Sequence, residues 1–123
     1  MADVAKRAAP SYFNKGNAYF FLKDYQRAAD SYKKALKGNP HSKDYHFNIA
    51  NARLELKELD AAIYHFKTVV ELDKEQTYAN SEAALSALAS IYQDHLKDSK
   101  RALKVYRELL KRFPDNQSAK DAI

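Results

Sequence analysis

Apolar side chains recur every three to four residues in six successive segments, which is the spacing of one buried helix face. The segments cover residues 11–22, 25–37, 43–56, 59–72, 77–95 and 99–113. Short polar turns separate them, and Gly38 and Pro40 predict a helix end with a C-terminal glycine and a proline beyond it. Pro10 suits the first turn of the first helix. The pattern predicts an all-α chain of helix pairs.

A repeat of 34 residues underlies this pattern. The stretch 13–18, FNKGNA, returns as FNIANA at 47–52, and the same offset relates Ala28 to Ala62 and Tyr32 to Phe66. A period of this length is typical of stacked helical pairs. From Ala62 to Ala102 the spacing is 40, so about six residues are added in the third unit. We expect an extra helical turn at the start of the 77–95 helix and a longer turn at 96–98.

The small and aromatic positions of the repeat resemble those of the tetratricopeptide repeat family. The first unit matches this family's pattern with Tyr12, Gly16, Tyr19, Ala28, Tyr32, Ala35 and Pro40. The second matches in part, and the third matches if one residue is inserted in the turn before Ala102. The resemblance implies a right-handed α-solenoid of three helix-turn-helix repeats, 9–42, 43–76 and 77–115. Residues 1–8 would be an N-terminal extension and 116–123 the start of a capping or further helix.

Composition and charge narrow the classes of function. The 123 residues are 46% hydrophobic and 30% charged, with no cysteine, so disulfides and thiolate chemistry are excluded. The net charge of +5 arises almost entirely within residues 1–42, without the dense Lys/Arg clusters of nucleic-acid binders. No segment has the length of a signal peptide core or a membrane span. We therefore expect a soluble chain with neither nucleic acid nor membrane as partner, and favour the cytoplasm while leaving localisation open.

Sequence patterns for catalysis are missing. His41, His46, His65 and His95 lack metal-ligand spacing, and we expect His46 and His65 on helix surfaces or in packing contacts. No phosphate-binding glycine loop or nucleophile elbow occurs. The sequence predicts no enzyme, no cofactor and no metal site.

The resemblance implies a concave groove lined by the first helix of each repeat, and it gives the candidate partner-binding residues. These are Phe13, Asn14, Asn17, Phe20, Phe47, Asn48, Asn51, Leu54, Glu55, Ser86 and Ser90. Phe21 also falls on an inward position. An asparagine amide both donates and accepts, so Asn17 and Asn51 could hold the backbone of an extended peptide without belonging to the core. The alternative is that they only follow the consensus of the family, in which asparagine is common at these positions. The phenylalanines could form pockets for a partner or pack against neighbouring helices.

One specific mode of the family does not fit. Members that bind the acidic C-termini of heat-shock chaperones use a carboxylate clamp of asparagines and cations. Asn17 and Asn48 match the asparagines, but Phe13, Ala83 and Ala87 stand where the cations should be. We therefore predict a protein–protein interaction module that binds an extended peptide or partner segment other than these acidic C-termini.

The main alternative is a structural role, with self-association or stacking onto further repeats through the C-terminal end. Leu103, Leu110 and Ala122 would stay partly available there for a second copy. A single-stranded RNA binder of related design would need base-reading side chains in register across the units, and two units sharing asparagines are too few to argue it.

Overall fold

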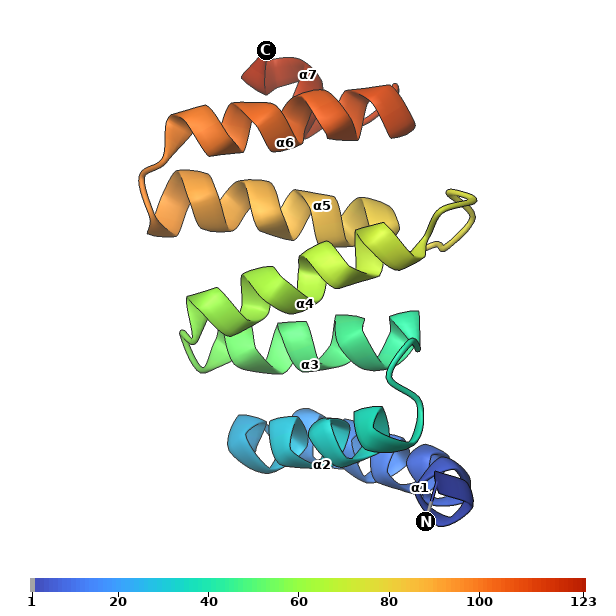
Figure 1. Cartoon of the computed structure of the whole chain (residues 1–123). Coiled ribbons are helices and arrows are strands. Elements are labelled where there is room, and N and C mark those ends of the chain that lie inside the picture. Colours follow the sequence, from blue (N-terminus) through green and yellow to red (C-terminus); the bar gives the residue numbers. More distant parts are fainter. Residues whose placement is uncertain (1) are drawn as a thin grey trace.

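The computed structural model describes residues 2–123, which form helices and connecting turns without a strand. The helices are α1 (Ala2–Phe21), α2 (Tyr25–Gly38), α3 (Lys43–Glu55), α4 (Leu59–Leu72), α5 (Ser81–Ser90) with a π-helical continuation η1 (Ile91–His95), α6 (Ser99–Arg112) and α7 (Gln117–Ala122). They stack one after another, with the two termini at opposite ends (Figure 1). This arrangement confirms the predicted all-α solenoid. No helix among the described residues is long and apolar enough to span a bilayer.

The first helix begins well before its predicted start. Because α1 starts at Ala2, Pro10 lies inside the helix, and its predicted place in the first turn is wrong. The added turns pack against the end of α2, where a Cβ on Gly38 would collide with the carbonyl oxygen of Ala5. The helix α2 ends at Gly38 as predicted, although Gly38 has no positive φ and so does not form a left-handed cap. The glycine is needed for close approach of two helices.

Small residues allow the helices to pack closely, as the repeat pattern predicts. Ala28, Ala62 and Ala102 are each 0–1% exposed. A Cβ on Gly16 would lie 2.6 Å from the ring of Tyr32, so the absence of a side chain there lets the tyrosine pack between α1 and α3. The larger core cluster joins the second and third repeats around Phe66. The buried residues form clusters along the solenoid, and we expect function on its outer faces.

The intra-repeat turns 22–24, 56–58 and 96–98 have the same length, so the predicted longer turn at 96–98 is wrong, and the added residue lies in the helix before the third turn. Lys23 and Lys57 have φ angles of 63° and 62°, and the residues after them donate backbone hydrogen bonds to carbonyls five positions earlier. In the third turn, Asp98 N donates to Tyr92 O, six positions earlier. The π-helical segment η1 accommodates this extra residue. The predicted single insertion before Ala102 is thus confirmed.

The remaining added residues form a loop at 73–80, and the predicted helical turn from Thr77 is wrong because α5 begins at Ser81. The buried carboxylate of Asp73 holds this loop. It accepts hydrogen bonds from Thr77 N at 2.9 Å, Tyr78 N at 3.1 Å and Ser81 Oγ at 2.6 Å. Burial alone would raise the pKa of Asp73, but these donors and the Lys43 ammonium hold it below its usual value.

Tyr78 attaches the same loop to the start of α3. Its hydroxyl donates to Asp44 Oδ1, and Lys43 Nζ lies 5.7 Å from the centre of its ring. Burial and the adjacent Asp44 carboxylate raise the pKa of Tyr78 to about 12, so the phenol stays protonated and remains a donor. The loop is therefore anchored by two carboxylates, although it has no helical structure of its own.

The C-terminal helix α7 packs on the last repeat. Asn116 Oδ1 caps it by accepting from Ala119 N at 3.0 Å, and Ala119 is fully buried with Leu85 and Leu109. Ile123 beyond it is 60% exposed. The helix therefore covers only part of the end of the solenoid.

Candidate functional site

A small pocket lies between the first helices of the first two repeats, where the sequence predicts the groove. It has a volume of about 290 Å³ and is lined by Asn17, Phe20, Phe21, Tyr32, Asn48 and Asn51. We call it the asparagine pocket. Asn17, Phe20 and Phe21 come from α1, Tyr32 from α2, and Asn48 and Asn51 from α3. The structure thus brings together four of the predicted site residues, along with Phe21.

Asn17 is held in place by its neighbours. Its Oδ1 accepts a hydrogen bond from the Tyr32 hydroxyl at 2.6 Å and another from Asn48 Nδ2 at 2.9 Å. Tyr32 is 1% exposed, and burial raises the pKa of its phenol. Removing Asn17 would leave a buried hydroxyl without its acceptor, which costs about 1–3 kcal/mol. The expectation that Asn17 contributes nothing to stability is therefore wrong.

The other two asparagines keep free hydrogen-bonding groups. Asn48 uses its amide nitrogen toward Asn17, which leaves its Oδ1 as an acceptor. Asn51 lines the pocket and makes no hydrogen bond or other polar contact with the described residues. An acceptor and a complete amide thus lie on α3, three positions apart on one helix face. The polar side of the pocket can pair with both the N–H and C=O groups of a peptide.

Phe20 and Phe21 form the apolar side of the pocket. Phe20 is half-buried and its ring meets Tyr25 edge-on at 5.1 Å between centroids. Phe21 is 86% exposed at the last position of α1. An exposed aromatic beside unpaired amides is the arrangement expected of a binding site rather than of a packed core.

Three other candidates pack within the protein. Phe13 lies against Tyr32 and Tyr45, with ring centroids 5.7 and 4.7 Å apart. Phe47 packs on Phe66, and Leu54 joins the same core cluster. All three side chains make packing contacts within the protein, and none of them lines the asparagine pocket.

The remaining candidates lie outside the pocket. Asn14, Glu55 and Ser90 are exposed, and Ser86 is half-buried. Ser90 Oγ donates to Asp94 Oδ2 at 3.1 Å. The pocket also contains a group that we did not predict as a site residue, the Tyr32 hydroxyl. The repeat pattern marks Tyr32 only as a packing aromatic, and no sequence signal connects its hydroxyl with Asn17.

His46 and His65 pair inside the stack, in agreement with the packing expectation. Their Nδ1 atoms are 2.9 Å apart, and His46 Nε2 lies 2.7 Å from the carbonyl oxygen of Pro40. A carbonyl only accepts, so His46 carries its proton on Nε2 and accepts on Nδ1 from His65. Burial lowers the pKa of both rings, that of His65 to about 4 with further contributions from His46 and Arg53. Among residues 2–123, no group of three or more potential ligands is placed to hold a metal ion.

Comparison with known proteins identifies the repeats. The sequence profile of the tetratricopeptide repeat family matches residues 13–79, and a second profile of the same family matches residues 83–116. Hsp70-Hsp90 organizing protein 1 of Glycine max is 30% identical over 109 residues, covering 89% of this chain and 18% of that protein. Human serine/threonine-protein phosphatase 5 is 29% identical over 119 residues, covering 97% of this chain and 23% of that protein. The chain thus spans less than a quarter of the length of these relatives.

Solved structures share the fold. The N-terminal domain of stress-induced protein-1 from C. elegans superimposes with a TM-score of 0.84 at 23% identity, covering 96% of this chain and 94% of that one. The first repeat domain of Spaghetti (RPAP3), bound to the HSP90 peptide SRMEEVD, gives a TM-score of 0.77 at 26% identity, covering 94% and 87%. The repeat spacing, the helical stack and the profile matches all agree. This chain belongs to the tetratricopeptide repeat family.

Proposed function

We propose that this chain is a protein-interaction module that binds an extended peptide segment in the asparagine pocket. The observation that carries the proposal is the Asn51 amide, which has no polar partner among the residues that the structure describes and lies beside the free Oδ1 of Asn48. A peptide backbone offers the matching donor and acceptor. Phe20 and Phe21 supply the adjoining apolar surface. The ligand is therefore a segment that pairs through its backbone and places one apolar side chain against the two rings.

The ligand differs from the acidic C-terminal peptide bound to the Spaghetti domain. The clamp positions in this chain are Phe13, which packs on aromatic rings, Ala87, which packs on the core, and Ala83, which is exposed and apolar. None of them can neutralise a carboxylate, and a carboxylate without a cationic partner is held weakly. We therefore expect the pocket to select uncharged, apolar segments over acidic ones.

The proposal can be tested with a library of linear peptides displayed on phage and selected on the whole chain. A selected peptide is then titrated by calorimetry into the wild type and into Asn51→Ala. We expect the substitution to weaken binding about 5- to 30-fold, because a buried peptide group loses its partner. The exposed Asn14→Ala, outside the pocket, is the matched control and should bind like the wild type.

Asn51→Ala is a better test than a substitution at Asn17, because Asn17 supports Tyr32. The thermal unfolding of Asn51→Ala should match that of the wild type. In parallel, the peptide SRMEEVD should bind more weakly than the selected peptide. Equal binding by Asn51→Ala and wild type, or a preference for SRMEEVD, would overturn the proposal.

Self-association at the C-terminal end is a second candidate. Leu103, Tyr106 and Ala122 line a hollow of about 410 Å³ between α6 and α7, close to the exposed Ile123. A second copy could bury this surface. Light scattering across a range of concentrations should then show a rising mass, and removal of residues 116–123 should change both that mass and the stability. A constant monomer mass would leave peptide binding as the sole proposed function.

A further inference from the structure

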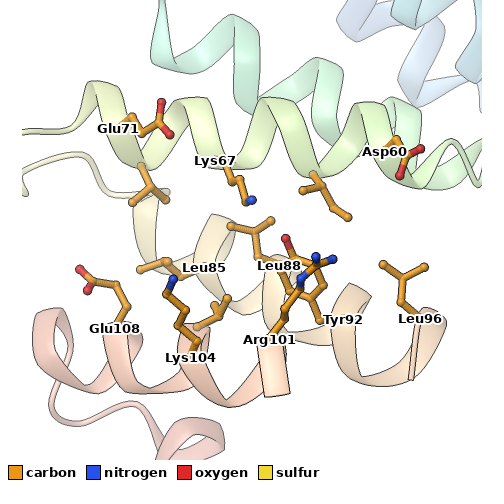
Figure 2. A pocket seen from close by; sticks show the side chains of 13 residues that line it. Asp60, Lys67, Glu71, Leu85, Leu88, Tyr92, Leu96, Arg101, Lys104 and Glu108 are labelled. Carbon is orange, nitrogen blue, oxygen red and sulfur yellow. The ribbon is translucent and has the colours of Figure 1, made fainter. Parts of the chain in front are cut away.

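A larger groove lies on a different surface, between the second helices of the second and third repeats. It encloses about 650 Å³, with α4 on one side, α6 on the other and α5 as its floor (Figure 2). The floor consists of Leu85, Leu88 and Tyr92, each 3–4% exposed. Ile63 and Val70 line it from α4 and Val105 lines it from α6. We call it the α4–α6 groove.

Comparison with the preceding helices explains why this groove is open. We define the first junction as α2, α3 and α4, and the second junction as α4, α5 and α6. At the first, His65 of α4 reaches His46 of α3 through a 2.9 Å contact. The matching positions at the second are Val105 and Leu85, two apolar side chains that both line the hollow. The histidine pair of the first junction is thus replaced at the second by two apolar side chains that line a groove.

Charged side chains border the apolar floor unevenly. Glu108 pairs with Arg112 Nε at 2.7 Å, and Arg101 pairs with Asp98 at 3.5 Å. Lys67 and Lys104 line the groove from opposite sides and form no ion pair with the described residues. Both point into the space between α4 and α6, with Glu71 and Glu108 toward one end and Asp60 at the other (Figure 2). Asp60 and Glu71 also line the groove without an ion pair to the described residues, so its lining carries three acidic and three basic side chains. The middle of the groove, between Lys67 and Lys104, is complementary to acidic groups of an amphipathic ligand.

We propose that the α4–α6 groove binds an amphipathic helix of a partner protein, with its apolar stripe on Leu85 and Leu88 and acidic residues between Lys67 and Lys104. The sides of the groove favour a helix because their lining residues recur at helical spacing, as in Ile63, Lys67 and Val70. Such ridges pack against the ridges of another helix. The volume matches a few apolar side chains of one helix, as in other helix-in-groove interfaces. This site is distinct from the asparagine pocket and does not depend on it.

A synthetic helix is the direct probe of this proposal. It has about 18 residues, leucines at i, i+4, i+7 and i+11, and two glutamates flanking the central leucines. A second peptide carries lysines in place of the glutamates. We expect the glutamate peptide to bind the wild type about ten-fold or more tightly than the lysine peptide, measured by fluorescence anisotropy.

Charge reversal locates the binding. Lys67→Glu with Lys104→Glu should weaken the glutamate peptide about ten-fold or more and strengthen the lysine peptide. Both lysines are exposed, so the circular dichroism and thermal melting of this variant should match those of the wild type. Lys15→Glu with Lys33→Glu changes the same number of exposed charges elsewhere and should leave both affinities within about two-fold.

Several results would overturn the proposal. One is that the wild type binds the glutamate peptide and the lysine peptide with equal affinity. Another is that the two charge-reversed variants change these affinities by the same factor. The groove would belong to a second copy if the wild type forms a dimer by light scattering that Lys67→Glu with Lys104→Glu dissolves. If oleate binds in the groove and covers it, and neither peptide binds, the ligand of the groove would be a lipid. If none of these probes binds, the groove is not a helix-binding site.

Discussion

The first and second junctions use the same three-helix arrangement but differ in the chemistry at matching positions. Small residues determine the stacking at both, since Ala62 and Ala102 are equally buried. The surface of each junction depends on a second pair of matching positions, which hold His46 and His65 at the first junction and Leu85 and Val105 at the second. His46 and His65 close the first junction with a polar contact, whereas Leu85 and Val105 leave the second as an apolar groove. Within a repeat fold, the same backbone geometry can therefore carry a polar contact in one unit and an apolar groove in the next.

The largest expected effect concerns the loops that lead into the two junctions. The first loop, 39–42, is short, whereas the second, 73–80, depends on Asp73. Asp73→Ala removes the acceptor of three hydrogen bonds and should lower the free energy of unfolding by about 2–4 kcal/mol. Urea denaturation measures this. Asp60→Ala, at an exposed carboxylate on α4, is the control and should change stability by under about 0.5 kcal/mol. A small effect of Asp73→Ala would show that the loop is held by other contacts.

Acid should weaken the first junction selectively. The pKa values of His46 and His65 are lowered, so the unfolded chain binds more protons than the folded one as pH falls below about 6.5. The contribution of the two neutral histidines to the free energy of unfolding is fully present above that pH. It is lost toward pH 4 and amounts to about 1–3 kcal/mol after allowance for solvent screening. A proton on each ring would also place two N–H groups against one another.

Converting the first junction into a copy of the second isolates this effect. In the double variant His46→Leu with His65→Val, the free energy of unfolding should fall less between pH 6.5 and 4.5 than in the wild type. The remaining loss is the part that the carboxylates cause. His95→Leu is the control, since this histidine is exposed, and it should keep the slope of the wild type. Denaturation midpoints at several pH values give the comparison. Equal slopes in all three proteins would show that the histidine pair does not titrate with folding.

The smallest expected effect comes from the same substitution at matching positions. His65→Phe removes the donor to His46 Nδ1 and should destabilise the protein by about 1–2 kcal/mol. Val105→Phe adds a ring to the open groove and should change stability by under about 1 kcal/mol, because space exists for it. Thermal melts of both variants at neutral pH measure the difference. A larger loss at Val105 than at His65 would contradict the assignment of open and closed junctions.

Most of the fold follows from the sequence because helix pairing depends on local periodicity. The repeated alanines, the aromatic positions and the single insertion before Ala102 all agree with the structure. The errors arose where tertiary contacts override local signals. The helix α1 begins before its predicted start, and its added turns pack against Gly38, which is distant in sequence. The 73–80 loop is held by a buried carboxylate, whereas its sequence alone suggested more helix.

The candidate site was predictable in position but not in detail. Helical spacing places Asn17, Asn48 and Asn51 on facing sides of α1 and α3, and they do line one pocket. The sequence does not show that Asn17 is saturated by Tyr32 and Asn48, since the contact to Tyr32 depends on how the two helices cross. The second groove was not predicted at all, because it depends on side-chain volumes at Leu85 and Val105 rather than on a motif.

The most direct test of the central claim is a nuclear magnetic resonance titration of the isotope-labelled chain with a peptide selected from the linear library. The side-chain amide signals of Asn48 and Asn51 report on the asparagine pocket itself. We predict that these two signals and the backbone amides around Phe20 and Phe21 shift most, while those of Lys67 and Lys104 do not change. Shifts confined to α4 and α6, with the Asn51 amide unaffected, would contradict the assignment of the asparagine pocket as the peptide-binding site.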